Sequence, residues 1–122
     1  MFLRRSKKNV GSYGEKIAAD HLAHKGYKIV ETNFATKYGE IDIVAKDQDE
    51  LVFVEVKSRT DTEYGYPETS IHKKKLDHLR RMAEIYIQNK HLEHTPYRID
   101  AVSILLSGND VQNIEHYVNI SC

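Results

Sequence analysis

The pattern of apolar and polar positions predicts a helix near the start of the chain. Apolar residues recur at helical spacing from Ser12 to Lys25, and Gly26 follows as a typical helix terminator. Ser12 and Glu15 have the spacing of a capping box, in which two side chains satisfy free backbone amides of the first turn. We therefore expect the helix to begin at Ser12, with Glu15 as its capping partner.

Five later segments are rich in Val, Ile, Phe or Tyr and are separated by polar breaks, as is typical of strands. They cover residues 27–34, 39–46, 50–59, 97–106 and 111–118. The second and third strands should form a hairpin that turns at Gln48 and Asp49. An amphipathic helix is predicted over 71–89, after a segment 61–69 without periodicity that we expect to be a loop bordering a site.

This order of elements predicts an α/β fold in which a mixed sheet of about five strands is flanked by two main helices. A length of 122 residues suits one domain over 1–122. Residues 1–10 include four basic side chains and are expected to form a flexible N-terminal segment.

Composition narrows the class of protein. Hydrophobic residues make up 40% of the chain and charged residues 30%, which is typical of a soluble globular domain. No stretch approaches the ~20 apolar residues of a membrane span, and no signal peptide is recognisable, so we expect a cytoplasmic protein that does not bind a membrane. The single cysteine, Cys122, excludes an internal disulfide and a cysteine-based zinc site. A net charge of zero makes local charge patterning the informative feature.

Polar and apolar residues alternate in the predicted hairpin. Because side chains alternate along a strand, Glu40 and Asp42 should share one face. Ile41 and Ile43 should point to the other, apolar face.

The turn fixes the register of this hairpin. With Gln48 and Asp49 at its centre, Asp42 lies opposite Glu55. Residues in such positions have Cβ atoms about 4.5 to 5.5 Å apart, so two carboxylates there need a compensating cation. Mg²⁺, or Mn²⁺ in its place, is held by one or two carboxylates together with water and phosphate. Lys57, two residues after Glu55, would reach the same place and serve an attacking water or the charge on a phosphate.

A plain structural interpretation is also open. The same register pairs Glu40 with Lys57, and charged residues on the solvent face of a hairpin often form cross-strand ion pairs without further function.

Several motifs together resemble the bacterial YraN family over nearly the whole chain. They are Gly14-Glu15, Asn33, Gly39-Glu40-Ile41-Asp42, Phe53-Val54-Glu55-Val56-Lys57-Ser58-Arg59, Lys75 and Arg98-Ile99-Asp100. That family is similar in fold to restriction endonucleases and archaeal Holliday junction resolvases. The resemblance implies a restriction-endonuclease-like core and an active site formed by Glu15, Asp42, Glu55 and Lys57, with Asp42 and Glu55 as metal ligands. One departure is Ile41, where the related nucleases often have proline before the aspartate.

Basic residues beside this site are candidates for nucleic-acid binding. They are Arg59, Lys73, Lys74, Lys75, Arg80 and Arg81. Lys75 is equally compatible with a surface lysine whose stem covers apolar residues. The expected function is metal-dependent cleavage of phosphodiester bonds in DNA, with branched DNA as one candidate substrate, and the alternative is a non-catalytic nucleic-acid-binding module; a homodimer is left open.

Two further patterns favour structural roles. Asp100 lies amid strand residues and is expected to hydrogen-bond a neighbouring loop. The pairs His21 with His24 and His91 with His94 lack a third ligand at a metal-site spacing, so we expect solvated surface there.

Overall fold

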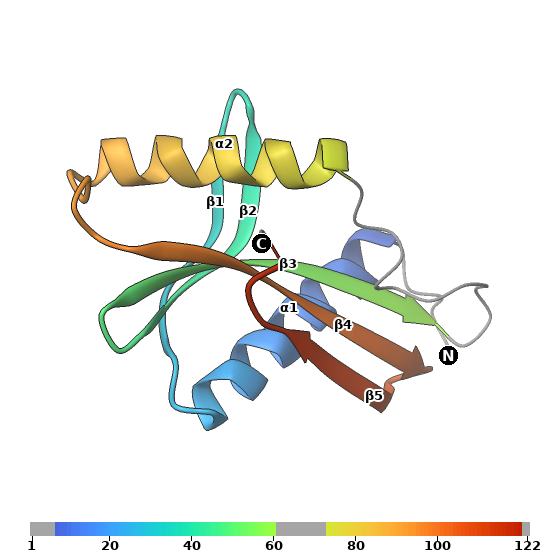
Figure 1. Ribbon diagram of the computed structural model, residues 1–122. Helices are drawn as coiled ribbons and strands as arrows, with labels where there is room; N and C mark the ends of the chain where they lie inside the picture. Colours follow the sequence, from blue (N-terminus) through green and yellow to red (C-terminus); the bar gives the residue numbers. More distant parts are fainter. Residues whose placement is uncertain (1–6, 61–72, 121–122) are drawn as a thin grey trace.

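The computed structural model describes residues 7–60 and 73–120, with side chains from Ser12 onward. A single sheet contains five strands in the order β1-β2-β3-β4-β5 (Figure 1). The elements are α1 (Lys7–His24), β1 (Lys28–Thr36), β2 (Gly39–Asp47), β3 (Glu50–Thr60), α2 (Lys73–Asn89), β4 (Tyr97–Ser107) and β5 (Asp110–Tyr117). β3 and β4 are parallel and the other pairs are antiparallel. The prediction of a mixed five-stranded α/β fold is confirmed; the expected loop 61–69 lies outside the described residues.

The first helix differs from the prediction at its start. It begins at Lys7, so Ser12 lies inside the helix and the capping-box prediction is wrong. Residues 7–10, which we expected to be flexible, are helical. This first turn and a half adds no run of apolar residues at helical spacing, which is why periodicity did not reveal it.

The end of α1 was predicted correctly, and Gly26 explains it. Its φ of +96° is a conformation that glycine adopts without a steric penalty. The amide of Tyr27 donates to the carbonyl of Leu22 and the amide of Gly26 to that of Ala23, each at 3.0 Å. These two bonds form a Schellman motif, which satisfies the last carbonyls of the helix and turns the chain into β1.

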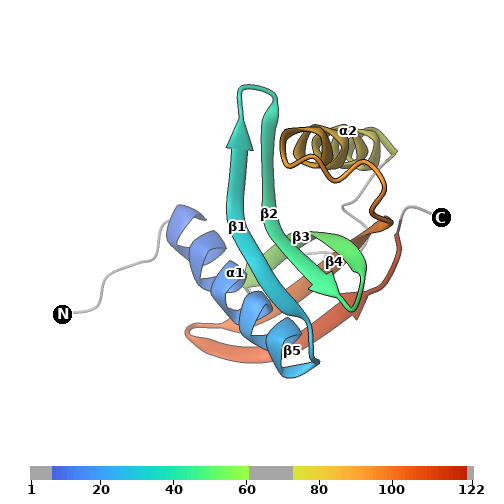
Figure 2. The same ribbon diagram turned by 90° about the vertical axis from the view of Figure 1, so that its left-hand side faces the viewer.

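The two helices lie on opposite faces of the sheet (Figure 2). One core cluster joins α2 to residues such as Val44, Phe53 and Ile99. The other joins α1 to Val52 and Val102, among others. Both faces of the central strands are therefore buried, which accounts for the nearly continuous apolar sequences of β3 and β4. In the described part of the chain, no helix is long and apolar enough to cross a membrane.

The β1–β2 hairpin changes its packing partner halfway along. Ile43 packs in the α1 cluster, whereas Ile41 packs in the α2 cluster, so the prediction that they share one face is wrong. In β1, Ile29 packs against the α1 cluster and Phe34 against the α2 cluster. Between them Asn33 has a φ of +55°, a left-handed conformation that breaks the alternation of a regular strand.

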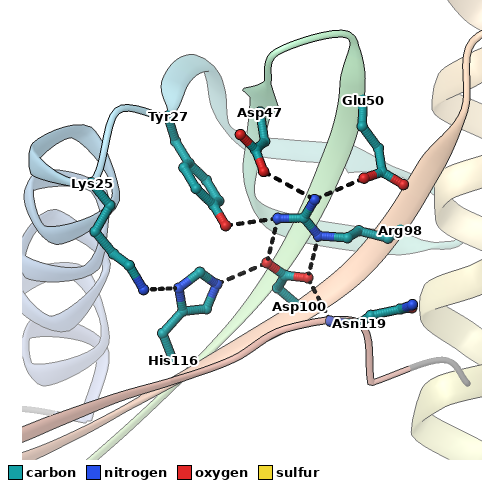
Figure 3. Close-up of polar contacts among 8 residues, drawn as sticks. All are labelled: Lys25, Tyr27, Asp47, Glu50, Arg98, Asp100, His116 and Asn119. Atoms are coloured by element: carbon teal, nitrogen blue, oxygen red, sulfur yellow. Dashed lines mark hydrogen bonds and ion pairs between the residues drawn. The ribbon is translucent and has the colours of Figure 1, made fainter.

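A buried polar network ties the far end of the sheet together (Figure 3). Asp100 is fully buried and accepts hydrogen bonds from Arg98 Nε at 3.0 Å and from the amide of Asn119 at 2.9 Å. His116 Nε2 lies 2.8 Å from the same carboxylate. Burial would raise the pKa of Asp100, but the bonds from His116 and Arg98 hold it below its ordinary value. The structural role predicted for Asp100 is confirmed.

Arg98 extends this network to the β2–β3 turn. Its guanidinium contacts Asp47 at 3.2 Å, Glu50 at 2.8 Å and the hydroxyl of Tyr27 at 2.7 Å (Figure 3). One planar side chain with several fixed donors thus joins the α1–β1 connection, the hairpin turn and β4.

Gly14 allows α1 to approach β3 closely. A Cβ at this position would lie 1.7 Å from Ser58 Oγ and 2.9 Å from Ser58 Cβ. The hydroxyl can rotate away, but the Cβ of Ser58 cannot. The absence of a side chain at Gly14 therefore sets the helix–sheet distance next to Glu15.

Replacing Gly14 with Ala is therefore expected to destabilise the protein by about 1–3 kcal/mol, because overpacking outweighs the better helix propensity of alanine. Ser12→Ala, at an exposed position in the same helix, is the matched control and should be neutral or slightly stabilising. Denaturant unfolding of both variants measures the difference. A Gly14→Ala protein as stable as Ser12→Ala would contradict the close approach, and Ser58→Gly should restore part of the loss.

Candidate active site

The β2–β3 register agrees with the prediction in the part of the hairpin next to the turn. Asp47 pairs with Glu50 across the turn, and the ladder continues to the pair Ile43 and Val54. It ends there, one residue before Asp42 and Glu55 would pair. In the described part of the chain no ion pair joins Glu40 to Lys57, so the plain cross-strand interpretation of those two residues has no support.

Asp42 replaces the ladder with a side-chain contact. The amide of Val56 donates a hydrogen bond of 2.8 Å to Asp42 Oδ2. This bond keeps the carboxylate against β3 although the two backbones no longer pair. The sequence did not reveal this contact, because it depends on where the strands part.

The carboxyl group of Asp42 is held beside that of Glu55. Burial is the largest cause that raises the pKa of Asp42, and the charge of Glu55 is the next; together they bring it to about 8. The bond from Val56 acts in the opposite direction. Without further cations, the pair of Asp42 and Glu55 therefore holds a proton to higher pH than an isolated carboxyl group does.

Glu15 reaches the same place from α1. Burial raises its pKa most, and the charge of Glu40 adds to this; hydrogen bonds with the side chains of Asn33 and Asp42 lower it. The structure thus brings together Glu15, Asp42 and Glu55, the three acidic residues that the family resemblance selected. Asn33, whose left-handed backbone bends β1, contributes its side chain to the same group.

Lys75 points to the acidic pair. Its Nζ lies 3.1 Å from Oε2 of Glu55, whose side chain is 10% exposed. The contact has the distance of an ion pair but not the direction of a hydrogen bond, so Oε2 accepts no hydrogen bond. The sequence predicted either a surface lysine or a phosphate-binding lysine at position 75. It could not predict the contact with Glu55, because that contact joins α2 to β3.

Lys57 is half-buried on β3, two residues after Glu55 and therefore on the same side of the strand. Phe53, on that same side, packs in the α2 cluster. That Lys57 reaches the acidic pair, as the Glu-x-Lys spacing predicted, stays a prediction.

The other basic candidates are distributed around α2. Lys73 and Lys74 are exposed in its first turn. Arg80 forms an ion pair of 3.1 Å with Asp77, and Arg81 lies over the ring of Tyr38. Arg59 is half-buried near the end of β3. Lys75 contacts the acidic pair, and the role of all six residues in nucleic-acid binding stays a prediction.

The acidic group fits a hard divalent cation as a partial ligand set. Carboxylate oxygens are the donors that Mg²⁺ prefers, and the buried Oε2 of Glu55 has capacity for a further partner. Among the residues described, no group of three or more His, Cys, Asp and Glu side chains is arranged to hold an ion alone. Asp42 and Glu55 would therefore share a metal with water and phosphate oxygens.

The histidine pairs lie away from this group. His24 Nδ1 is 2.8 Å from the carbonyl of Asp20 within α1. Burial lowers the pKa of the half-buried His21, which disfavours its charged form.

The fold and site define a class: a small α/β protein with buried carboxylates and a following lysine where two strands of a mixed sheet part. Comparison with known proteins identifies the family of this chain. The family model described as "Uncharacterised protein family UPF0102" matches residues 14–104. The chain belongs to the UPF0102 family, the one that the sequence motifs resembled under the name YraN.

Relatives cover most of this chain. A UPF0102 protein of Clostridioides difficile is 42% identical over 109 residues, which is 89% of this chain and 96% of the relative. One of Dehalococcoides mccartyi is 47% identical over 102 residues, 84% of each chain. One of Caldanaerobacter subterraneus is 39% identical over 116 residues, 93% of this chain and 95% of the relative.

The raised pKa of Asp42 predicts a pH-dependent effect of Asp42→Asn. Because the folded-state pKa lies above the unfolded value of 3.8, Asp42 favours the fold most below pH 3.8 and loses this contribution as pH rises through about 8. The neutral asparagine does not titrate. The free energy of unfolding of the variant, relative to wild type, should therefore increase from pH 5 to pH 8.5. Denaturant unfolding in EDTA at several pH values measures this, and a difference independent of pH would contradict it.

The Lys75–Glu55 contact predicts a specific loss on Lys75→Met, which removes the charge and keeps the stem. Buried Glu55 would lose a compensating cation, so stability at pH 7 should fall by about 1 kcal/mol. Lys74→Met, at the exposed neighbouring position, is the control and should change little. A double-mutant cycle with Glu55→Gln in denaturant unfolding isolates the pair; a coupling energy near zero would show that the contact adds nothing.

Proposed function

We propose that this protein is a metal-dependent hydrolase of phosphodiester bonds in nucleic acid, with DNA as the expected substrate. The observation that carries the proposal is the group formed by buried Glu55 and half-buried Asp42 and Glu15, which lies where β2 leaves β3. The pKa values of Asp42 and Glu15 are raised, mainly by burial, and two such carboxyl groups in one place favour a chemical role over a packing role.

Each residue has a distinct part in this proposal. Asp42 and Glu55 would hold Mg²⁺ or Mn²⁺, and Val56 orients Asp42 through its amide. When bound, the metal would polarise the phosphate and lower the pKa of a water molecule. Lys57 would orient the attacking water or stabilise charge on a phosphate oxygen. Glu15, beside Asp42, would accept a proton from that water or complete its hydrogen bonds.

The resemblance to restriction endonucleases and archaeal Holliday junction resolvases supports the same chemistry, and it motivates branched DNA as a substrate to be tested. The basic residues of α2, above all Lys73 and Lys74, would hold the phosphate backbone through contacts without sequence preference. Action in the cytoplasm is part of this proposal.

One observation favours a second candidate, a nucleic-acid-binding module without catalysis. Lys75 already supplies a cation to Glu55, and the proton on Asp42 removes a further charge. The acidic group can therefore be neutralised by the protein itself, which permits an anionic polymer to approach without a metal.

Three substitutions distinguish these functions. Asp42→Asn and Glu55→Gln are expected to abolish Mg²⁺-dependent cleavage, by a factor of about 100 or more, and to leave nucleic-acid binding unchanged or tighter, because neither variant carries more negative charge near phosphate than the wild type. Lys57→Ala should lose cleavage but retain metal binding. Glu93→Gln, an exposed acid far along the chain from the site, is the control.

The measurements are calorimetric binding of Mn²⁺ and a cleavage time course on single-stranded, duplex, flap and four-way DNA. Wild-type protein that binds these nucleic acids but neither binds metal nor cuts would overturn the hydrolase and support the binding module. Wild-type protein that binds no nucleic acid would overturn both.

A further inference from the structure

The tip of the β1–β2 hairpin carries an exposed aromatic ring between two cations. Tyr38 is 51% exposed and belongs to neither core cluster. Lys37 Nζ lies 5.2 Å and Arg81 Cζ 5.5 Å from the centre of its ring. Exposed aromatic rings and cationic side chains are the groups that bind stacked bases and their phosphates. Both cations lie over the ring of Tyr38, so a base that stacks there would take the place of one of them.

The turn that carries this ring is held in place. The amide of Tyr38 donates to Thr36 Oγ1 at 3.1 Å. Gly39 has a φ of +144°, and a Cβ there would lie 2.5 Å from Nε2 of His78, so the turn approaches α2 closely. The tip extends past α2 in both views of the molecule (Figures 1 and 2). A ring fixed in this way loses little conformational entropy when it stacks on a ligand.

The ring is close to the acidic group along the chain. Tyr38 precedes Asp42 by four residues, which corresponds to about 13 Å along a strand. Successive base pairs of a duplex rise by about 3.4 Å, so a nucleic acid at the acidic group would pass the tip about four steps away. Arg81 comes from α2, the helix that also carries the exposed Lys73 and Lys74.

The bases inside a duplex are covered on both faces by their neighbours, so an external ring stacks only on a base that is unpaired or at an end. We propose that Tyr38 is a stacking platform for an unpaired base of the bound nucleic acid, with Lys37 and Arg81 contacting the adjacent phosphates. This inference rests on the proposed binding of nucleic acid and assigns its class: a strand with unpaired bases, as at a bulge, flap or branch, in preference to continuous duplex.

The experiment uses two DNA duplexes in EDTA, which prevents cleavage. One is fully paired, and the other carries a single unpaired 2-aminopurine, whose fluorescence is quenched when an aromatic ring stacks on it. Wild-type protein should bind the bulged duplex more tightly and quench the probe. Tyr38→Leu, which keeps apolar bulk without an aromatic face, should weaken binding of the bulged duplex about tenfold and lose the quenching, with the paired duplex unaffected. Tyr38→Phe should behave as wild type.

Val118→Ala, which shortens another exposed apolar side chain, is the control and should change neither affinity. Equal loss of affinity for both duplexes in Tyr38→Leu would overturn the inference, as would unchanged quenching. Wild-type protein that binds both duplexes equally without quenching also overturns it and leaves the proposed function intact. Wild-type protein that binds neither DNA overturns the proposed function as well. Because the wild-type measurement is decisive by itself, the test does not depend on the folding of the leucine variant.

Discussion

The hydrogen bond from the amide of Val56 to Asp42 Oδ2 is the contact on which the geometry of the candidate site depends. In a continuous antiparallel ladder, a backbone carbonyl of β2 would accept a bond from β3 at this level. Here a carboxylate accepts it, so β2 can leave β3 after Ile43 while Asp42 stays beside Glu55. The same bond stabilises the charged form of Asp42, but it does not offset burial and the nearby Glu55. At this site a side-chain carboxylate therefore takes the place of a backbone carbonyl of the ladder.

The parting of the strands also positions the hairpin tip. Asn33 accommodates a left-handed backbone opposite Asp42, and beyond it Phe34 and Ile41 pack in the α2 cluster. The hairpin is therefore bent at the acidic group, and its outer half is carried to α2, where Arg81 meets Tyr38. Residues in sparsely populated backbone conformations persist when the surrounding packing determines them, and they are common at functional sites. One distortion consequently accounts for both the acidic group and the exposed aromatic tip.

Most of the fold could be predicted from local patterns, because the strands and α2 have clear periodicity and Gln48-Asp49 fixes the β2–β3 register as far as the pair Ile43 and Val54. The start of α1 could not, since Ser12 and Glu15 have capping spacing in a helix that begins earlier. Strict alternation also failed between Ile41 and Ile43, because it assumes a regular strand and nothing in the sequence marks the bend except the tolerance of Asn33 for positive φ. The contacts of Lys75 and Arg98 are long-range, and only the packing of elements reveals them.

The balance of charge at the acidic group connects the two candidate functions. A nucleic acid brings negative phosphates to a place that already holds carboxylates, so neutralisation must come before or with binding. Without a metal, the proton on Asp42 and the ammonium of Lys75 supply it. A divalent cation between Asp42 and Glu55 would repel the proton and the ammonium group. It would favour the charged form of Asp42 and would compete with Lys75 for Oε2 of Glu55. Lys75 would then be released close to the position of a bound phosphate. Under the proposed function, the same residues would form a binding surface with less negative charge in the absence of metal and a charged, metal-holding site in its presence, and the relative affinity of Glu55 for Lys75 and for a cation would decide between them.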